Sequence, residues 1–181
     1  MIVSAGALFT GSSIYEVQLN GSAAGTQYDQ LKVNGQVQIQ NALLKVLAGF
    51  TPGLGTSFTI IDNDGTDPAL GTFGGLPEGE VFGVNGVALQ ISYTGGTGND
   101  VVLTRVAVPM PKILSISLDG SRRVLLQAKG ISQFDYTFLA SSNLVNWASV
   151  GVAHSNNNGE FSFTDTNTQN VAQQFYRVSA P

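Results

Sequence analysis

The sequence predicts an all-β chain made of two modules, and three observations lead to this prediction. Short stretches alternate apolar and polar residues with period two, as half-buried strands do. Turn-forming pairs such as Asn-Gly and Asp-Gly, and 22 glycines among 181 residues, interrupt these stretches. Pro109 and Pro111 favour an extended connector, because proline cannot donate to a strand ladder. We therefore expect modules at residues 1–107 and 113–181, joined by a proline linker at 108–112.

The composition excludes several kinds of partner and of chemistry. The net charge is -4 and no run of Lys or Arg occurs, so the basic surface of a nucleic-acid binder is missing. The chain has no cysteine, which excludes disulfides, thiol catalysis and cysteine-bound metals. No stretch approaches the roughly 18 apolar residues of a membrane span, and the first ten residues lack the features of a signal peptide. We expect no nucleic-acid partner and no membrane insertion.

The first module reads as a succession of short strands. We expect two of them on either side of Thr10–Ser13, and two more on either side of Asn34-Gly35, which predicts a hairpin or a tight turn. Ala42–Ala48 has helical propensity, but Gly49 ends it after barely two turns, so we expect a strand. The remaining strands lie at residues 57–61, 87–93 and 101–108, with a polar turn at 62–68 and a glycine- and proline-rich loop at 71–80.

The spacing of these strands suits either a solenoid coil or a small β-sandwich and does not choose between them. A family resemblance bears on the choice. Five segments, in their order and spacing, resemble the last coils of the passenger domains of autotransporter-like surface proteins: Tyr28–Gly35, Ala42–Val46, Gly55–Gly65, Gly71–Gly79 and Tyr93–Thr104. The resemblance covers residues 1–106 and implies a right-handed parallel β-helix. The family's long upstream repeat array and its translocator domain are missing, so we expect a shortened solenoid end.

The second module shows six short strands in about 70 residues, which is typical of a small antiparallel sandwich. They lie at residues 113–118, 124–128, 136–141, 147–151, 161–164 and 175–178. Three segments of this module, Tyr136–Trp147, Phe163–Asp165 and Phe175–Val178, are similar to fibronectin-type-III-like modules at the C-termini of large secreted bacterial proteins. This resemblance covers residues 112–181 and implies an Ig-like extracellular accessory module.

Two acidic turns are candidate calcium sites. Asp62, Asp64 and Asp67 lie at nearly alternate positions of one turn, as the oxygen ligands of short calcium loops do. Phe73 stands where an EF-hand would place its last acidic ligand, so a solvated turn is the alternative reading. The stretch that ends in Asn-Asp100-Val-Val-Leu fits the nonapeptide of calcium-binding repeats, although only one copy occurs. Asp100 could instead cap its own turn.

Aromatic residues of the second module are candidate glycan ligands. Trp147 and Tyr136, with neighbouring phenylalanines and tyrosines, could form a platform on which sugar rings stack. The alternative is that the single tryptophan fills the core of the sandwich, as a lone Trp in such a module commonly does.

The sequence offers no convincing catalytic set. His154 is the only histidine, so a site built on several imidazoles is excluded, and no Gly-x-Ser-x-Gly motif supplies a nucleophile. Glu78 and Glu80 lie in one loop and not on opposite sides of a cleft, as a glycosidase would need. We therefore expect a protein that is not an enzyme.

The predicted function is that of an extracellular or bacterial cell-surface protein with a structural or adhesive role. Because the end coil of a solenoid carries unpaired backbone groups, it could self-associate into filaments or form the end of a surface stalk. The alternative is a carbohydrate-binding accessory module of a large secreted polysaccharide-degrading enzyme, with a surface glycan as its partner. Apart from possible calcium, we expect no cofactor.

Overall fold

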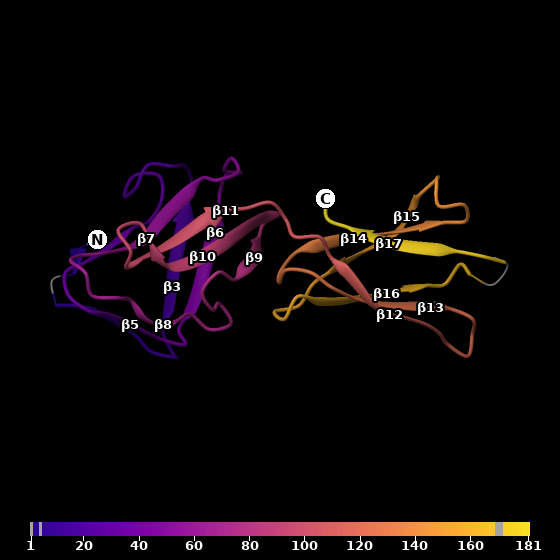
Figure 1. The fold of residues 1–181 in the computed structure, drawn as a ribbon, viewed down its shortest axis with the longest axis horizontal. Coiled ribbons are helices and arrows are strands. Elements are labelled where there is room, and N and C mark those ends of the chain that lie inside the picture. The colour runs from indigo at the N-terminus through magenta and orange to yellow at the C-terminus, as the bar shows by residue number, and fades with distance from the viewer. Residues whose placement is uncertain (1, 4, 169–171) are drawn as a thin grey trace. The chain divides into compact units, whose positions relative to one another are not determined.

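The computed structural model describes all residues except 1, 4 and 169–171, and it is all-β, as the sequence predicts (Figure 1). Strands and turns account for the described residues, among which there is no helix. The strands form several small sheets, and none of these closes into a barrel within the described part of the chain. Two compact units divide the chain, unit 1 (Met1–Ala107) and unit 2 (Val108–Pro181).

Parallel pairing dominates the first part of unit 1. Its strands are β1 (Ile2–Val3), β2 (Ala7–Phe9), β3 (Ile14–Leu19), β4 (Leu31–Val33), β5 (Val37–Gln40), β6 (Leu43–Ala48), β7 (Ser57–Asn63) and β8 (Leu70–Thr72). β1, β4 and β7 pair in parallel, as do β2, β5 and β8, and as do β3 and β6. Paired strands lie about 30 residues apart along the chain, so the same three-strand course is repeated.

Antiparallel pairing takes over after β8. Strands β9 (Val81–Val84), β10 (Val87–Gly95) and β11 (Asp100–Arg105) form a meander, and β11 also pairs with β7. The largest sheet therefore has the order β1-β4-β7-β11-β10-β9. As a result, the second edge of β7 is covered by β11, whereas β1 remains an edge strand.

The period-two pattern explains which side chains enter the core of unit 1. In β3, Val17 and Leu19 are fully buried, while Glu16 and Gln18 point outward. Paired residues of parallel strands point to the same face of the sheet. Glu16 therefore lies opposite Lys45, and the two form an exposed ion pair at 2.7 Å. Aromatic rings fill the interior: Phe9, Tyr15, Phe73 and Tyr93 form one contiguous set.

Asn34-Gly35 forms a tight turn, but its interpretation as a hairpin is wrong. The flanking strands β4 and β5 belong to different sheets, so the turn is a corner between sheets. Gly35 has φ +105, a left-handed conformation that favours glycine. The amide of Gly35 donates a hydrogen bond of 2.7 Å to the Asp64 carboxylate in the next course of the chain. Corners and hairpins use the same turn residues, so only long-range pairing distinguishes them.

The sequence reading missed three strands of unit 1, one of which is the two-residue strand β1. β8 begins just before the expected loop at 71–80, and β9 follows that loop directly. β9 contains Gly83, which weakens its strand pattern, but the turn after it carries a clear signal. Asn85 and Gly86 both have positive φ, at 48° and 77°, as a two-residue hairpin turn requires.

Unit 2 consists of two three-stranded antiparallel sheets packed on one another. Its strands are β12 (Lys112–Leu118), β13 (Val124–Lys129), β14 (Asp135–Ser141), β15 (Ala148–His154), β16 (Glu160–Asp165) and β17 (Phe175–Ser179), so all six expected strands are present. The sheet orders are β12-β13-β16 and β15-β14-β17. Leu126, Tyr136 and Phe138 are fully buried, and the Tyr136 ring stacks on Phe161 with centroids 4.4 Å apart.

Candidate functional site

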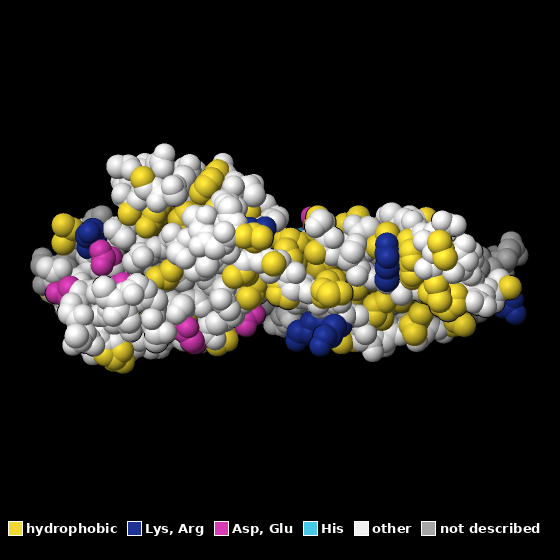
Figure 2. All heavy atoms as spheres, turned by 45° about the horizontal axis from the view of Figure 1, so that its top comes forward, with side chains coloured by type: hydrophobic (Ala, Val, Ile, Leu, Met, Phe, Trp, Pro, Cys, Tyr) yellow, Lys and Arg dark blue, Asp and Glu magenta, His cyan; other side chains and the backbone are white. Residues whose placement is uncertain are grey.

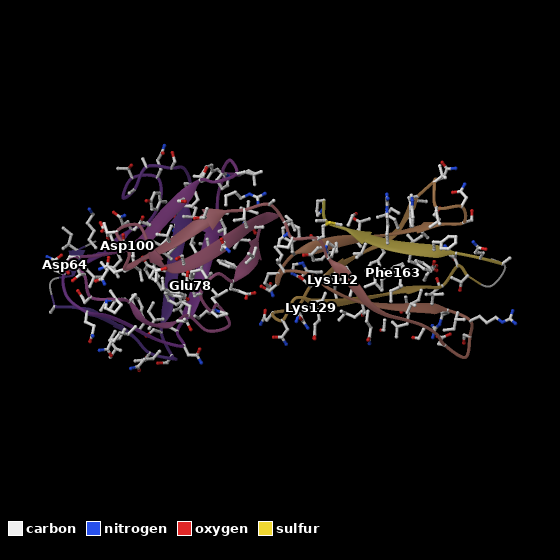
Figure 3. All side chains as sticks on the ribbon, in the orientation of Figure 1. Asp64, Glu78, Asp100, Lys112, Lys129 and Phe163 are labelled. Atoms are coloured by element: carbon white, nitrogen blue, oxygen red, sulfur yellow. The ribbon has the colours of Figure 1, made fainter. Side chains whose placement is uncertain are left out.

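A buried polar cluster lies where the turn after β7 meets the turn between β10 and β11. Asp100, labelled in Figure 3, is 3% exposed and has no cationic partner. One carboxylate oxygen accepts the Asn63 amide at 2.8 Å, and the other accepts the amide and hydroxyl of Thr97 at 3.0 and 3.2 Å. Hydrogen bonds from neutral donors therefore stabilise this buried charge.

Two asparagine side chains complete this cluster. The amide nitrogen of Asn99 lies 3.2 Å from the Asp64 carbonyl oxygen, 3.4 Å from that of Gly65 and 3.1 Å from that of Asp67. Asn63 donates to the Asp67 carbonyl at 2.7 Å, and its own side-chain oxygen is buried without a partner. Side-chain amides thus satisfy the carbonyl oxygens that a calcium loop would direct at its ion.

The four predicted calcium ligands have separate surroundings. Asp62 forms an ion pair with Lys32 at 3.2 Å, and Asp64 accepts the Gly35 amide. Asp67 contributes its backbone carbonyl to the polar cluster, and Asp100 alone is buried in it. Among the described residues, no three acidic, histidine or cysteine side chains are grouped so that they could hold a metal ion. Calcium binding at these positions stays a prediction.

The two predicted glycan ligands lie in different environments. Tyr136 is fully buried, and its hydroxyl oxygen accepts the Ile131 amide at 2.8 Å, so its ring has no exposed face. Trp147 directly precedes β15 and is partly exposed; it does not fill the core. Its indole N–H donates to the Leu144 carbonyl at 3.2 Å, and the Arg177 guanidinium lies 4.5 Å from the ring centroid, within cation–π range.

The other candidate groups are accounted for by single contacts. Glu78, labelled in Figure 3, accepts the Tyr93 amide at 2.6 Å, so it fastens its loop to β10. His154 contacts the Asp135 carboxylate at 2.8 Å on the exposed end of β15. Burial raises the pKa of the Tyr176 hydroxyl, as does the Asp165 carboxylate to which it donates at 2.9 Å.

The clearest unpartnered feature of unit 1 is a set of three edge strands, β1, β2 and β3, which we name the open edge. Each lies at the end of its sheet order, although residues 27–29 hydrogen-bond to the last part of β3 on that side. The amide of Ala7 donates to the Gln36 carbonyl at 2.9 Å, so the next amide, that of Leu8, points away from β5. Leu8 and Ile14 are also 60% and 63% exposed. Unpaired amides and apolar side chains at one edge are features of a strand that accepts a further strand.

Sequence reasoning missed Asn63, Thr97 and Asn99 as members of the polar cluster. A signal was present for two of them, since Thr97 and Asn99 belong to the same glycine-rich nonapeptide as Asp100. Asn63 lies in the other acidic turn, and nothing local indicates that the two turns meet.

Comparisons with known proteins give no identification: no family model, no curated protein and no solved structure matches this chain. Within the described residues, no helix is long and apolar enough to cross a membrane.

Proposed function

We propose that this chain is a structural or adhesive module of an extracellular or bacterial cell-surface protein. In this proposal unit 1 is the end of a right-handed parallel β-helix and unit 2 is a fibronectin-III-like sandwich. The three sets of parallel strands, repeated at about 30 residues, support the β-helix. The right hand follows from the strong preference of parallel crossover connections for that hand.

The observation that carries the proposal is the difference between the two ends of the parallel sheets. At one end β1, β2 and β3 are all edge strands. At the other end β11 pairs antiparallel with β7 and occupies its second edge. An antiparallel strand ends the repeat, because the next parallel course can no longer pair there. Unit 1 therefore has the properties of a cap that accepts a further coil on one side only.

This asymmetry favours the end of a stalk over the repeating subunit of a filament. A head-to-tail filament would require the open edge of one copy to pair with β6, β7 and β8 of the next. β6 and β8 end their sheet orders, but β7 is paired on both sides, because β11 covers its second edge. A continuous filament through all three sheets is therefore obstructed. A coil can add along β1, β2 and the first half of β3, but residues 27–29 would have to move from the last part of β3, where Asp29 hydrogen-bonds with Gln18.

The test is to add one coil at the open edge. Residues 1–30 are repeated ahead of Met1, which matches the observed offset between paired strands. The added coil is expected to raise the melting temperature and to slow hydrogen exchange at the Leu8 amide of the original coil by more than about tenfold.

Two variants of the original Leu8 serve as a matched pair. Leu8→Pro removes the edge-facing N–H and is expected to prevent docking of the added coil, whereas Leu8→Ala keeps the N–H and is expected to permit it. If the added residues remain unprotected in the parent and in the Leu8→Ala chain, while the rest stays folded, the end-cap proposal is wrong.

A glycan-binding role is a second candidate, favoured by the partial exposure of Trp147 outside the core. The pair of Trp147 and Arg177 presents an aromatic ring beside a donor group, which are the elements of a sugar-stacking site. Trp147→Ala should abolish retention on insoluble glycans if this role is correct. Equal retention of the parent and the variant would exclude it. Neither result affects the coil-addition test.

A further inference from the structure

Three backbone carbonyl groups of the turn after β7 converge on one side chain. The side-chain nitrogen of Asn99 lies 3.1–3.4 Å from their oxygens, which belong to Asp64, Gly65 and Asp67. This nitrogen carries only two hydrogens for three acceptors. Carbonyl oxygens directed at one point repel one another unless a positive group lies between them. The turn therefore requires a positively polarised group at this point, and the Asn99 amide supplies it.

The same spacing suits the oxygen ligands of a calcium ion. Such ligands lie about 2.3–2.6 Å from the ion, so neighbouring ligands are about 2.8–3.6 Å apart. The separations around the Asn99 nitrogen fall in this range. Rotation of the Asn99 amide by half a turn about its terminal bond would put its oxygen in the place of its nitrogen. The side-chain oxygen would then be a fourth ligand beside the three carbonyl oxygens.

The neighbours of Asn99 accommodate both orientations of its amide. The Thr97 hydroxyl donates to the Asn99 side-chain oxygen at 2.8 Å. The same hydroxyl lies 3.2 Å from the Asp100 carboxylate, which can accept its proton instead. After rotation the Asn99 nitrogen would donate to the Thr97 oxygen, and the Thr97 hydroxyl would donate to Asp100. Only the three carbonyl oxygens would then lack a positive partner, and a cation supplies one.

A second side chain of the polar cluster has an unpaired oxygen. Asn63 is 2% exposed, and its side-chain oxygen is buried without a hydrogen-bond partner among the described residues. The nitrogen of the same amide donates to the Asp67 carbonyl at 2.7 Å. Because the two atoms of an amide are about 2.2 Å apart, the unpaired oxygen lies within about 5 Å of that carbonyl oxygen. A cation beside the Asp67 carbonyl would remove the cost of this unpaired oxygen.

The electrostatic surroundings favour a cation. The Asp100 carboxylate is buried, and its oxygens accept hydrogen bonds from neutral donors. Residues 1–107 contain eight Asp and Glu residues but three Lys and Arg residues. Figure 2 shows acidic side chains on the visible face of unit 1, and Figure 3 places Asp64 and Asp100 at the same end of this unit. The excess of negative charge attracts and stabilises a bound cation.

We propose that the two turns form a calcium site whose ligands are backbone and amide oxygens. These ligands are the carbonyl oxygens of residues 64, 65 and 67 and the side-chain oxygens of Asn63 and Asn99. Asp100 accepts the Asn63 backbone amide and balances part of the charge. The set therefore differs from the four aspartate side chains that the sequence predicts. Because its ligands are neutral, the site binds weakly, with a dissociation constant of about 0.1–1 mM.

Isothermal titration calorimetry of the full chain with calcium chloride tests this ligand set. Asn99→Asp supplies a charged ligand and should lower the dissociation constant at least about tenfold. Asn99→Leu has a similar volume but no ligand atom, and it should raise the dissociation constant at least about tenfold. Asp62→Asn is the matched control, because Asp62 pairs with Lys32 and lies outside the proposed set. It should change the dissociation constant by less than about threefold.

The melting temperatures of the same proteins provide a second measurement. In chelator, Asn99→Asp should melt below the parent, because a carboxylate cannot donate to the three carbonyl oxygens. Calcium at about 10 mM should reverse this loss, whereas sodium chloride of equal ionic strength should not. An Asn99→Asp chain that is equally destabilised with and without calcium would show that Asn99 is a hydrogen-bond donor only.

Two further results would overturn the proposal. One is a parent chain that binds no calcium at about 10 mM. The other is calcium binding that Asp62→Asn abolishes and Asn99→Leu leaves intact, since the exposed carboxylates would then hold the ion.

Discussion

Single hydroxyl and carboxylate groups fix the loops of this protein. The Tyr93 hydroxyl accepts the Phe73 amide at 2.9 Å and donates to the Leu76 carbonyl at 2.7 Å, so one side chain of β10 holds the glycine-rich loop against the core. Asp100 has the same role for the turns that meet around it. In both places a buried polar group is stable because each of its neighbours is a hydrogen-bond partner.

The stability of unit 1 should fall at high pH because of Tyr93. Burial raises the pKa of Tyr93 from 10.0 to about 12, with an opposing effect of the Phe73 amide and a further increase from Glu78. The unfolded chain then loses this proton first, so the stabilisation is complete below pH 10 and is lost as the pH rises to about 12. Denaturant unfolding between pH 8 and pH 12 measures this loss.

Tyr93→Phe is the control for this pH dependence. Burial also raises the pKa values of Tyr15 and Tyr28, so the free energy of unfolding of the variant still decreases with pH. Above pH 10 this decrease should be smaller than in the parent chain by up to about 1.4 kcal/mol per pH unit. Identical slopes in parent and variant would show that Tyr93 does not titrate in this range.

Asp100→Ala should destabilise unit 1 by about 2–5 kcal/mol. The substitution leaves the buried backbone amide of Asn63 and the partly buried backbone amide of Thr97 without an acceptor, and an unsatisfied buried group costs about 1–3 kcal/mol. Asp64→Ala is the matched control, because Asp64 is exposed and accepts one amide; it should cost less than about 1 kcal/mol. Urea unfolding compares the two variants, and equal losses would contradict the role of the cluster.

The same variants test the calcium prediction. A calcium ion bound by Asp100 would raise the melting temperature of the parent chain, and chelation would lower it again. Asp100→Ala would then lose this response. A melting temperature that does not change with calcium or with chelator would exclude the predicted site.

At the scale of the element, the close approach of β8 to β5 depends on one glycine. Gly71 has φ +79, and a Cβ atom there would lie 2.0 Å from the Ile39 carbonyl oxygen. Gly75 has a similar φ of +73, but a Cβ atom there would meet nothing within 4 Å. The two positions therefore separate backbone strain from steric contact.

Gly71→Ala should destabilise unit 1 by more than about 3 kcal/mol, since the strain adds to a contact that forces β8 away from β5. Gly75→Ala should cost only the strain, about 1–2 kcal/mol. Urea unfolding of both variants measures the difference between their losses in free energy of unfolding. Equal losses would mean that β8 can shift away from β5 without an energetic cost.

At the scale of the whole molecule, the two units have separate cores. The buried cluster of unit 1 runs from Val17 to Leu103 and contains no residue of unit 2. Unit 2 has its own core around Tyr136 and Phe138. Separate cores imply separate unfolding transitions, because cooperativity depends on shared contacts.

The single tryptophan allows this to be measured. Trp147 lies in unit 2, so its fluorescence reports the unfolding of that unit alone, whereas far-ultraviolet circular dichroism reports both units. The two urea transitions should not coincide. A shorter chain of residues 1–107 should reproduce the part of the circular dichroism transition that the fluorescence of Trp147 does not detect. Superimposable transitions would show instead that the units unfold together.

The sequence alone determined the all-β class, the position of most strands and the six strands of unit 2, because period-two alternation and turn residues are local signals. Tertiary structure decided which strands pair: Asn34-Gly35 became a corner between sheets, and Asn63 joined Asn99 and Asp100 across the fold. It also decided that Tyr136 is buried and Trp147 is partly exposed. Alternation specifies that one face of a strand is covered, but the partner that covers it is chosen by contacts between residues far apart in the chain.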